Sequence, residues 1–221
     1  MIENIKEEFT AKQKSIITND WCELLTSFVK NKNLYLFNRI GPLVVGIWLK
    51  MGRSNRFYVP IYYVHNLCNE FPYSALSISL RIEGKVVKPE HHNQMYMKEA
   101  ETLVKNAYIA IDGDLHIDDI IKGYERYFEN PILDSYLEYE DFALICGWTK
   151  DRNRIQYALN TVYEQLRLWP EERYFSRHGG FENWFAKLEE RTWDGDKLNQ
   201  IYESELVNHK LTQIPQRNII V

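Results

Sequence analysis

The stretch that decides the fold is Leu34–Lys50, which reads LYLFNRIGPLVVGIWLK. It consists of two runs of apolar and aromatic residues, separated by Gly41 and Pro42. Runs of this kind, bounded by turn-forming residues, are typical of β-strands. A connection this short joins antiparallel neighbours, because a parallel crossover needs about a dozen residues. We therefore expect an antiparallel sheet that begins here.

Two further segments of the first half have the same character, namely Phe57–Leu67 and Ala75–Ile82. In the second segment, Ser77, Ser79 and Arg81 alternate with apolar residues, which is the pattern of a strand with one side in solvent. Together with the opening stretch, these segments predict an antiparallel sheet of about four strands.

Helical spacing of apolar residues appears on both sides of the predicted strands. Before them, Trp21 and Phe28 belong to a pattern that predicts an N-terminal helix, with Thr18–Asp20 as candidates for its N-cap. From residue 93 onward the pattern is mainly helical. The clearest helix follows Asp151, where apolar residues recur on one side of the helix: Ile155, Leu159, Val162, Tyr163 and Leu166. The predicted fold class is therefore α+β, with an N-terminal helix, an antiparallel sheet and a mainly helical C-terminal half.

The boundary between the two halves carries no long linker rich in Gly, Ser or Pro. We therefore expect a single α+β domain over residues 1–221, with a β-rich part at about 34–90 and a helical part at about 93–211. Two separate domains are the alternative.

The composition and the cysteine pattern indicate the compartment. The 15 Tyr residues outnumber the 10 Gly residues, which argues against a disordered chain. Cys22, Cys68 and Cys146 are scattered and form no CxxC pair, so neither a disulfide framework nor a cysteine zinc site is expected. The first residues are acidic, unlike a signal peptide, and the most apolar stretch, Leu43–Leu49, is far shorter than the roughly 20 residues that span a bilayer. We expect a cytoplasmic protein.

The charge of the chain is unevenly distributed. The net charge is −4 in total, but residues 1–110 carry +4 and residues 111–221 carry −8. The window 112–141 alone carries −8, from ten acidic residues against Lys122 and Arg126. A negative total does not favour nucleic acid or an anionic membrane as a partner, so we expect neither.

The acidic window is also rich in tyrosine and phenylalanine. On a helix that begins near Asp134, acidic side chains recur at i, i+4 and i+7 and therefore share one side, flanked by tyrosines. A solvated acidic face is one interpretation. The other is a docking face, because tyrosines act as rigid anchors and carboxylates steer a basic partner. The candidate partner-binding residues are Asp134, Tyr136, Glu138, Tyr139, Glu140 and Asp141.

Known catalytic and metal-binding patterns are missing from the sequence. The six histidines form no HExxH motif, and a calcium loop that starts at Asp114 has Asp119 where a sharp turn requires Gly. Glu83-Gly84-Lys85 has the spacing of an acid and a lysine in some metal-dependent nucleases, but a hairpin turn explains it more simply. We expect no catalytic residue, cofactor or bound metal.

These observations predict a non-enzymatic protein-binding module. The favoured hypothesis is an inhibitor of the immunity or antitoxin type, which binds a basic protein partner such as a toxin or a nuclease. The first alternative is a metal-dependent hydrolase or nuclease assembled from Glu83, Lys85, His91 and acids around Asp112. A structural or assembly subunit with a large exposed apolar patch is the second alternative. The sequence does not indicate the oligomeric state.

Overall fold

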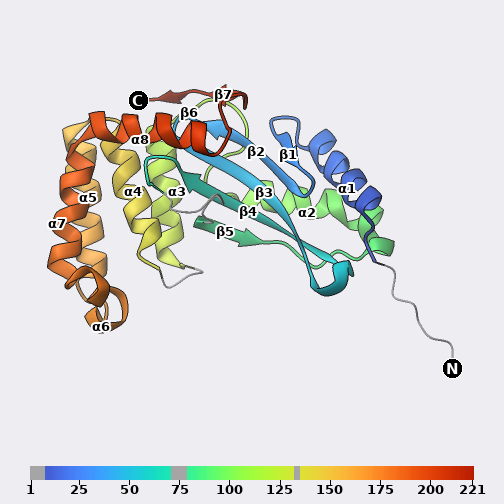
Figure 1. Cartoon of the computed structure of the whole chain (residues 1–221), viewed down its shortest axis with the longest axis horizontal. Helices are drawn as coiled ribbons and strands as arrows, with labels where there is room; N and C mark the ends of the chain where they lie inside the picture. The colour runs from blue at the N-terminus through green and yellow to red at the C-terminus, as the bar shows by residue number, and fades with distance from the viewer. Residues whose placement is uncertain (1–7, 71–78, 132–134) are drawn as a thin grey trace. The chain divides into compact units, whose positions relative to one another are not determined.

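The structure is a computed structural model that describes residues 8–70, 79–131 and 135–221. It contains an N-terminal helix, an antiparallel sheet of five strands and a mostly helical C-terminal half, with 54% helix and 20% strand (Figure 1). The predicted α+β fold class is confirmed. No helix within the described ranges is long and apolar enough to cross a membrane.

The chain divides into two compact units, which we describe separately. Unit 1 lies within Met1–Val64, Leu80–Leu115 and Ile214–Asn218, and unit 2 lies within His65–Ser79, His116–Gln213 and Ile219–Val221. The prediction of a single domain stays a prediction.

The main sheet belongs largely to unit 1, and its strands follow one another in chain order. The strands are β1 Val29–Lys32, β2 Tyr35–Ile40, β3 Leu43–Met51, β4 Tyr58–Asn66 and β5 Ser79–Glu83. A short strand, β7 Gln216–Arg217, pairs with β2 in parallel. The sheet thus has one more antiparallel strand than the sequence predicted. The additional strand is β1, which was not predicted because it is short and polar. Residues 75–78 of the last predicted strand lie outside the described ranges.

Two helices pack together in unit 1, α1 Ala11–Leu24 and α2 His92–Asn106. Thr10 caps α1 in a capping box with Gln13, so the predicted cap within Thr18–Asp20 is wrong. These three residues lie inside a helix that begins about two turns earlier than the apolar pattern suggested.

A chain of hydrogen bonds joins α1, α2 and β4. The Asp20 Oδ2 atom lies 2.8 Å from His92 Nε2, and His92 Nδ1 lies 2.9 Å from the Tyr58 hydroxyl. Trp21 Nε1 donates to the same hydroxyl at 3.2 Å. The Tyr58, His92 and Trp21 side chains are buried, so each of these polar groups needs the partner that it has.

Unit 2 is built from α-helices around a buried central helix, α4. They are α3 Ile117–Glu129, α4 Leu137–Trp148, α5 Arg152–Leu166, α6 Glu171–Tyr174, α7 Phe181–Trp193 and α8 Gly195–Asn208. Helix α4 contacts α3, α5, α7 and α8. The predicted helix after Asp151 is confirmed as α5, and the Asp151 carboxylate accepts two of its first backbone N–H groups.

The remaining elements are short. They are the 3-10 turns η1 Arg53–Asn55, η2 Pro89–His91 and η3 Ser176–His178, and the paired strands β6 Leu115–His116 and β8 Ile219–Ile220.

Candidate functional site

The acidic segment that the sequence singled out lies at the start of α4, inside unit 2. Glu138, Glu140 and Asp141 are only 2%, 8% and 4% exposed, and Tyr136 and Tyr139 are buried as well. Asp134 lies outside the described residues. The expectation that these side chains form an exposed face is wrong, because α4 is surrounded by other helices of the unit rather than lying at its surface. Whether the segment contacts a partner stays a prediction.

The buried carboxylates have few cationic neighbours. The Trp184 indole N–H donates to Glu140 Oε1 at 2.7 Å, and Arg191 Nη1 approaches Glu140 Oε2 at 4.0 Å. Glu138 Oε2 is buried without a hydrogen-bond partner in the described structure. Burying a carboxylate without a cation is costly, so the charged form of Glu138 is disfavoured.

The pKa values of the cluster follow from this burial. Burial, reinforced by the neighbouring Glu138 and Glu140 charges, raises the pKa of Asp141 to about 8, although hydrogen bonds from Ser79 and Asn69 act in the opposite direction. Burial also raises the pKa of Glu138. The segment is therefore a partly protonated internal cluster at neutral pH, and its carboxylates are poorly placed to attract a distant cation.

The two tyrosines of the segment are packing residues. The Tyr139 ring stacks on Phe128 with centroids 4.1 Å apart and planes nearly parallel. The Tyr136 hydroxyl lies 2.9 Å from His178 Nε2 and accepts a hydrogen bond from Arg177. Both rings therefore pack against other residues of unit 2.

Because of this burial, the net charge of −8 on residues 111–221 does not describe the exposed surface of unit 2. Among the described residues of unit 2, thirteen acidic and ten basic side chains are exposed. The surface of the unit is therefore close to neutral on the whole. A site for a cationic partner therefore requires a local arrangement of carboxylates without basic residues beside them.

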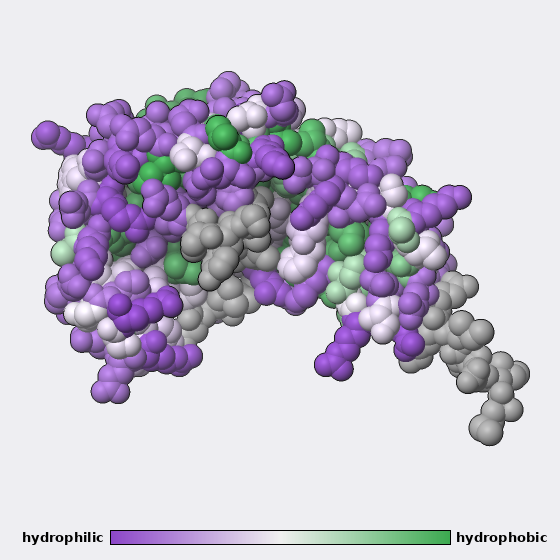
Figure 2. All heavy atoms as spheres, viewed as in Figure 1, coloured by the Kyte–Doolittle hydropathy of each residue, from purple (hydrophilic) through white to green (hydrophobic). Residues whose placement is uncertain are grey.

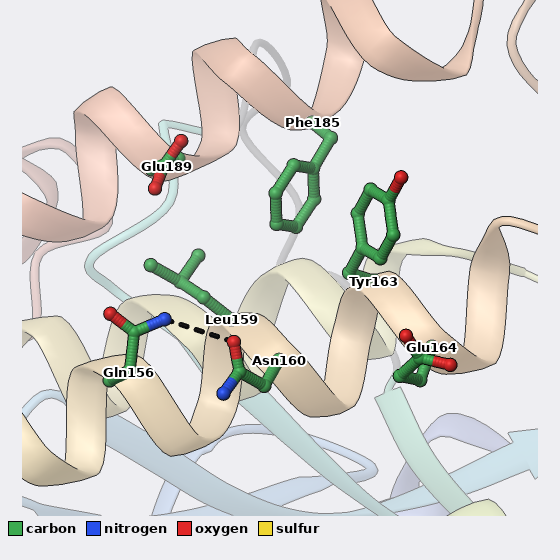
Figure 3. A pocket seen from close by; sticks show the side chains of 7 residues that line it. All are labelled: Gln156, Leu159, Asn160, Tyr163, Glu164, Phe185 and Glu189. Carbon is green, nitrogen blue, oxygen red and sulfur yellow. Dashed lines mark hydrogen bonds between the residues drawn. The ribbon is translucent and has the colours of Figure 1, made fainter.

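One groove of unit 2 provides such geometry, between α5 and α7 (Figure 3). This α5–α7 groove has a volume of about 430 Å³, and seven residues line it: Gln156, Leu159, Asn160, Tyr163, Glu164, Phe185 and Glu189. The lining includes two glutamates and no basic residue. It therefore combines apolar surface with negative charge.

Two half-buried aromatic rings stand on opposite sides of the groove. Tyr163 of α5 and Phe185 of α7 meet edge to face, with ring centroids 5.0 Å apart (Figure 3). Leu159, in the middle of α5, is buried, and Glu164 and Glu189 are exposed. The rings come from helix positions fixed by packing, so they form a rigid pair.

Carboxylates surround these rings. The Tyr163 hydroxyl donates to Glu182 Oε1 at 3.3 Å, and the negative charge of Glu182 raises the pKa of Tyr163. Glu164 pairs with Arg167 at 2.9 Å, whereas Glu189 makes no ion pair with any described residue. The groove can thus accept a cation at Glu189 without first breaking an ion pair.

The sequence predicted the helix that carries Leu159 and Tyr163, but it did not identify the groove as a site. The helical pattern shows Leu159, Tyr163 and Phe185 as part of apolar stripes. The available signal was the presence of Glu164 and Glu189 beside those stripes. The apolar sides of α5 and α7 are open to solvent at their edges because of the way these two helices pack. The pattern of a single helix does not indicate that packing.

The residues of the alternative hydrolase hypothesis lie in unit 1 and make structural contacts. Glu83 pairs with Arg81, and the Lys85 backbone N–H donates to Glu99 at 2.8 Å. Within the described ranges, no three His, Cys, Asp or Glu side chains are grouped so that they could hold a metal ion. The geometry gives this hypothesis no specific support.

Comparisons with protein-family models, with curated proteins and with solved structures found no match for this chain.

Proposed function

We propose that this chain is a cytoplasmic, non-enzymatic protein-binding module of the immunity or antitoxin type, which binds a basic protein partner. The α5–α7 groove carries the proposal, because it joins an apolar base, two aromatic rings and two carboxylates in a lining without a basic residue. The proposed partner class is a toxin or nuclease whose cleft is rich in lysine and arginine.

The chemistry of the groove suits a cationic side chain. A lysine or arginine can place its aliphatic part against the half-buried Phe185 ring and its charge near Glu189. Aromatic faces attract cations within about 6 Å of the ring centroid, so Tyr163 and Phe185 add to the attraction. The exposed carboxylates also speed the approach of a basic partner.

Site-specific photo-crosslinking in the native cell tests the proposal. A photoreactive phenylalanine analogue replaces Gln156 in the groove or, as a control, the exposed Glu203 on α8. We expect a cross-linked partner from the groove position only, and mass spectrometry should identify a protein with a basic cleft. Purified chain should then inhibit the activity of that partner.

A pair of charge variants distinguishes the groove from general electrostatics. Glu164→Lys with Glu189→Lys reverses the groove, and Glu171→Lys with Glu172→Lys makes the same net change at the exposed helix α6. The groove variant should lose the cross-link and the inhibition, whereas the α6 variant should keep both. A partner that still binds the groove variant, or that is acidic, contradicts the proposal.

A further inference from the structure

One end of the unit 1 sheet is rich in cations, and strands β1–β4 contain no acidic residue. Glu83, at the end of β5, pairs with Arg81. Residues 29–66, which cover β1–β4 and their turns, contain no Asp or Glu, and six basic residues: Lys30, Lys32, Arg39, Lys50, Arg53 and Arg56. Tyr35 of β2 pairs with Trp48 of β3, so the β1–β2 and β3–β4 turns lie at the same end of the sheet (Figure 1). Four of the six basic residues, Lys32, Lys50, Arg53 and Arg56, lie in or beside these turns.

An aromatic pair occupies the same end. The Tyr35 and Trp48 rings are direct cross-strand neighbours and stack with centroids 5.7 Å apart and planes 12° from parallel. Lys32 Nζ lies 4.4 Å from the Tyr35 ring centroid, and Lys50 Nζ lies 5.6 Å from that of Trp48. We call these four side chains the cation–aromatic row. Both rings are half-buried and both lysines are exposed.

We propose that the cation–aromatic row is a binding site for single-stranded nucleic acid. Such sites combine aromatic rings on which bases stack with cations that follow the phosphate backbone. In the row, two rings lie side by side on strands that hold them rigidly, and a lysine stands at each end. Phosphate groups can draw the exposed lysines away from the rings and leave the ring faces to the bases.

The surroundings favour this ligand over an anionic membrane. The rings stack on each other and are half-buried, which suits a planar base better than insertion between lipid chains. Among the basic residues of the two turns, Arg56 forms an ion pair with Glu8, at 3.6 Å. The earlier expectation of no nucleic-acid binding used the net charge of the whole chain, which does not describe this local surface.

Fluorescence anisotropy of labelled oligonucleotides with the full chain tests the inference. We use single-stranded RNA and DNA of about twelve nucleotides, within the range of sizes that such sites cover. Trp48→Leu should weaken binding roughly 5- to 100-fold, and Trp48→Phe, which keeps a ring, should restore most of it. Trp193→Leu removes an exposed tryptophan of unit 2 and should have no effect.

Charge variants give a second, independent readout. Lys32→Glu with Lys50→Glu should weaken binding and lower the slope of log K against log salt by about 0.7 for each lysine. Lys98→Glu with Lys105→Glu makes the same net change on α2 and should leave binding within about twofold of the parent. These lysines are exposed, so the variants test the proposal even if Trp48→Leu does not fold.

Several outcomes would overturn the inference. They are no binding of either oligonucleotide by the parent chain, equal binding by parent and row variants, and a preference for duplex over single strands. Vesicles that contain phosphatidylserine form the last arm of the experiment. Binding to these vesicles without binding to oligonucleotides would assign the row to a membrane surface instead.

Discussion

The Asp141→Asn substitution tests the buried acidic cluster most directly. Asn has nearly the shape of Asp and no charge, and it can still accept the hydrogen bonds that Ser79 and Asn69 donate to Asp141. The substitution therefore removes the ionisation of one carboxyl group and little else. Its effect on stability should depend on pH, and the sign of that dependence follows from the direction of the pKa shift.

Asp141 has a pKa of about 8 in the folded chain and an ordinary value of 3.8. Between these values the folded state holds a proton that the unfolded state has released, so the free energy of unfolding falls as pH rises. One pKa unit corresponds to about 1.4 kcal/mol, so the whole shift corresponds to on the order of 5 kcal/mol. The parent and Asp141→Asn should thus be similarly stable near pH 4, and the variant should be more stable by several kcal/mol near pH 9.

Urea unfolding, followed by tryptophan fluorescence at a series of pH values, measures this difference. Subtracting the free energies of unfolding of the two proteins removes the contribution of titrating groups that both contain. One such group is the buried His65, whose pKa is lowered to about 3 by burial. Glu203→Gln, an exposed change on α8, should give no pH-dependent difference. An Asp141→Asn variant that gains no stability as pH rises would refute the assignment of Asp141 as a buried, protonated carboxyl group.

Three further predictions concern other parts of the molecule. Reversing the charge of Glu164 and Glu189 should slow association with the partner strongly at low salt, and stopped-flow mixing should show this difference shrinking as salt screens it. Tyr58→Phe leaves His92 and Trp21 without their shared buried partner, and thermal and urea unfolding should show a loss of about 1–3 kcal/mol. Gly147→Ala would place a Cβ 2.3 Å from the Thr192 carbonyl oxygen, so urea unfolding should show a loss of about 1–3 kcal/mol or more. Gly113→Ala meets no atom within 4 Å and should cost only about 1 kcal/mol, from its positive φ.

Local patterns were sufficient for the fold class but not for every element. The paired runs of Leu34–Lys50 became β2 and β3 because apolar strands and a Gly-Pro turn specify a hairpin locally. Strand β1 reads VKNK, which has no such pattern, and it forms because β2 offers an edge with free backbone groups. Its existence depends on the neighbour, and a single segment does not reveal that dependence.

The burial of the acidic segment was not predicted, because sequence patterns give no measure of burial. Exposure is the ordinary state of Asp and Glu, so the stripe of Glu138 and Asp141 indicated a surface. In the structure α4 is packed on by α3, α5, α7 and α8, and both sides of it are buried. The apolar residues of α4 predicted one buried face, but only the packing of the neighbouring helices determines that the acidic face is buried too.

This burial separates the formal charge of the chain from the charge that a partner meets. The formal value of −4 counts Asp141 as ionised, yet with a pKa of about 8 its carboxyl group is mostly protonated at pH 7. Binding that depended on the overall charge would therefore be weak, since the exposed charges of unit 2 nearly balance. Electrostatic recognition therefore has to use local surfaces on which charges of one sign predominate. The α5–α7 groove has two glutamates and no basic residue. The cation–aromatic row has two lysines, in a part of the sheet without acidic residues. If the two proposals hold, the groove and row charge variants should each abolish one kind of binding and leave the other unchanged.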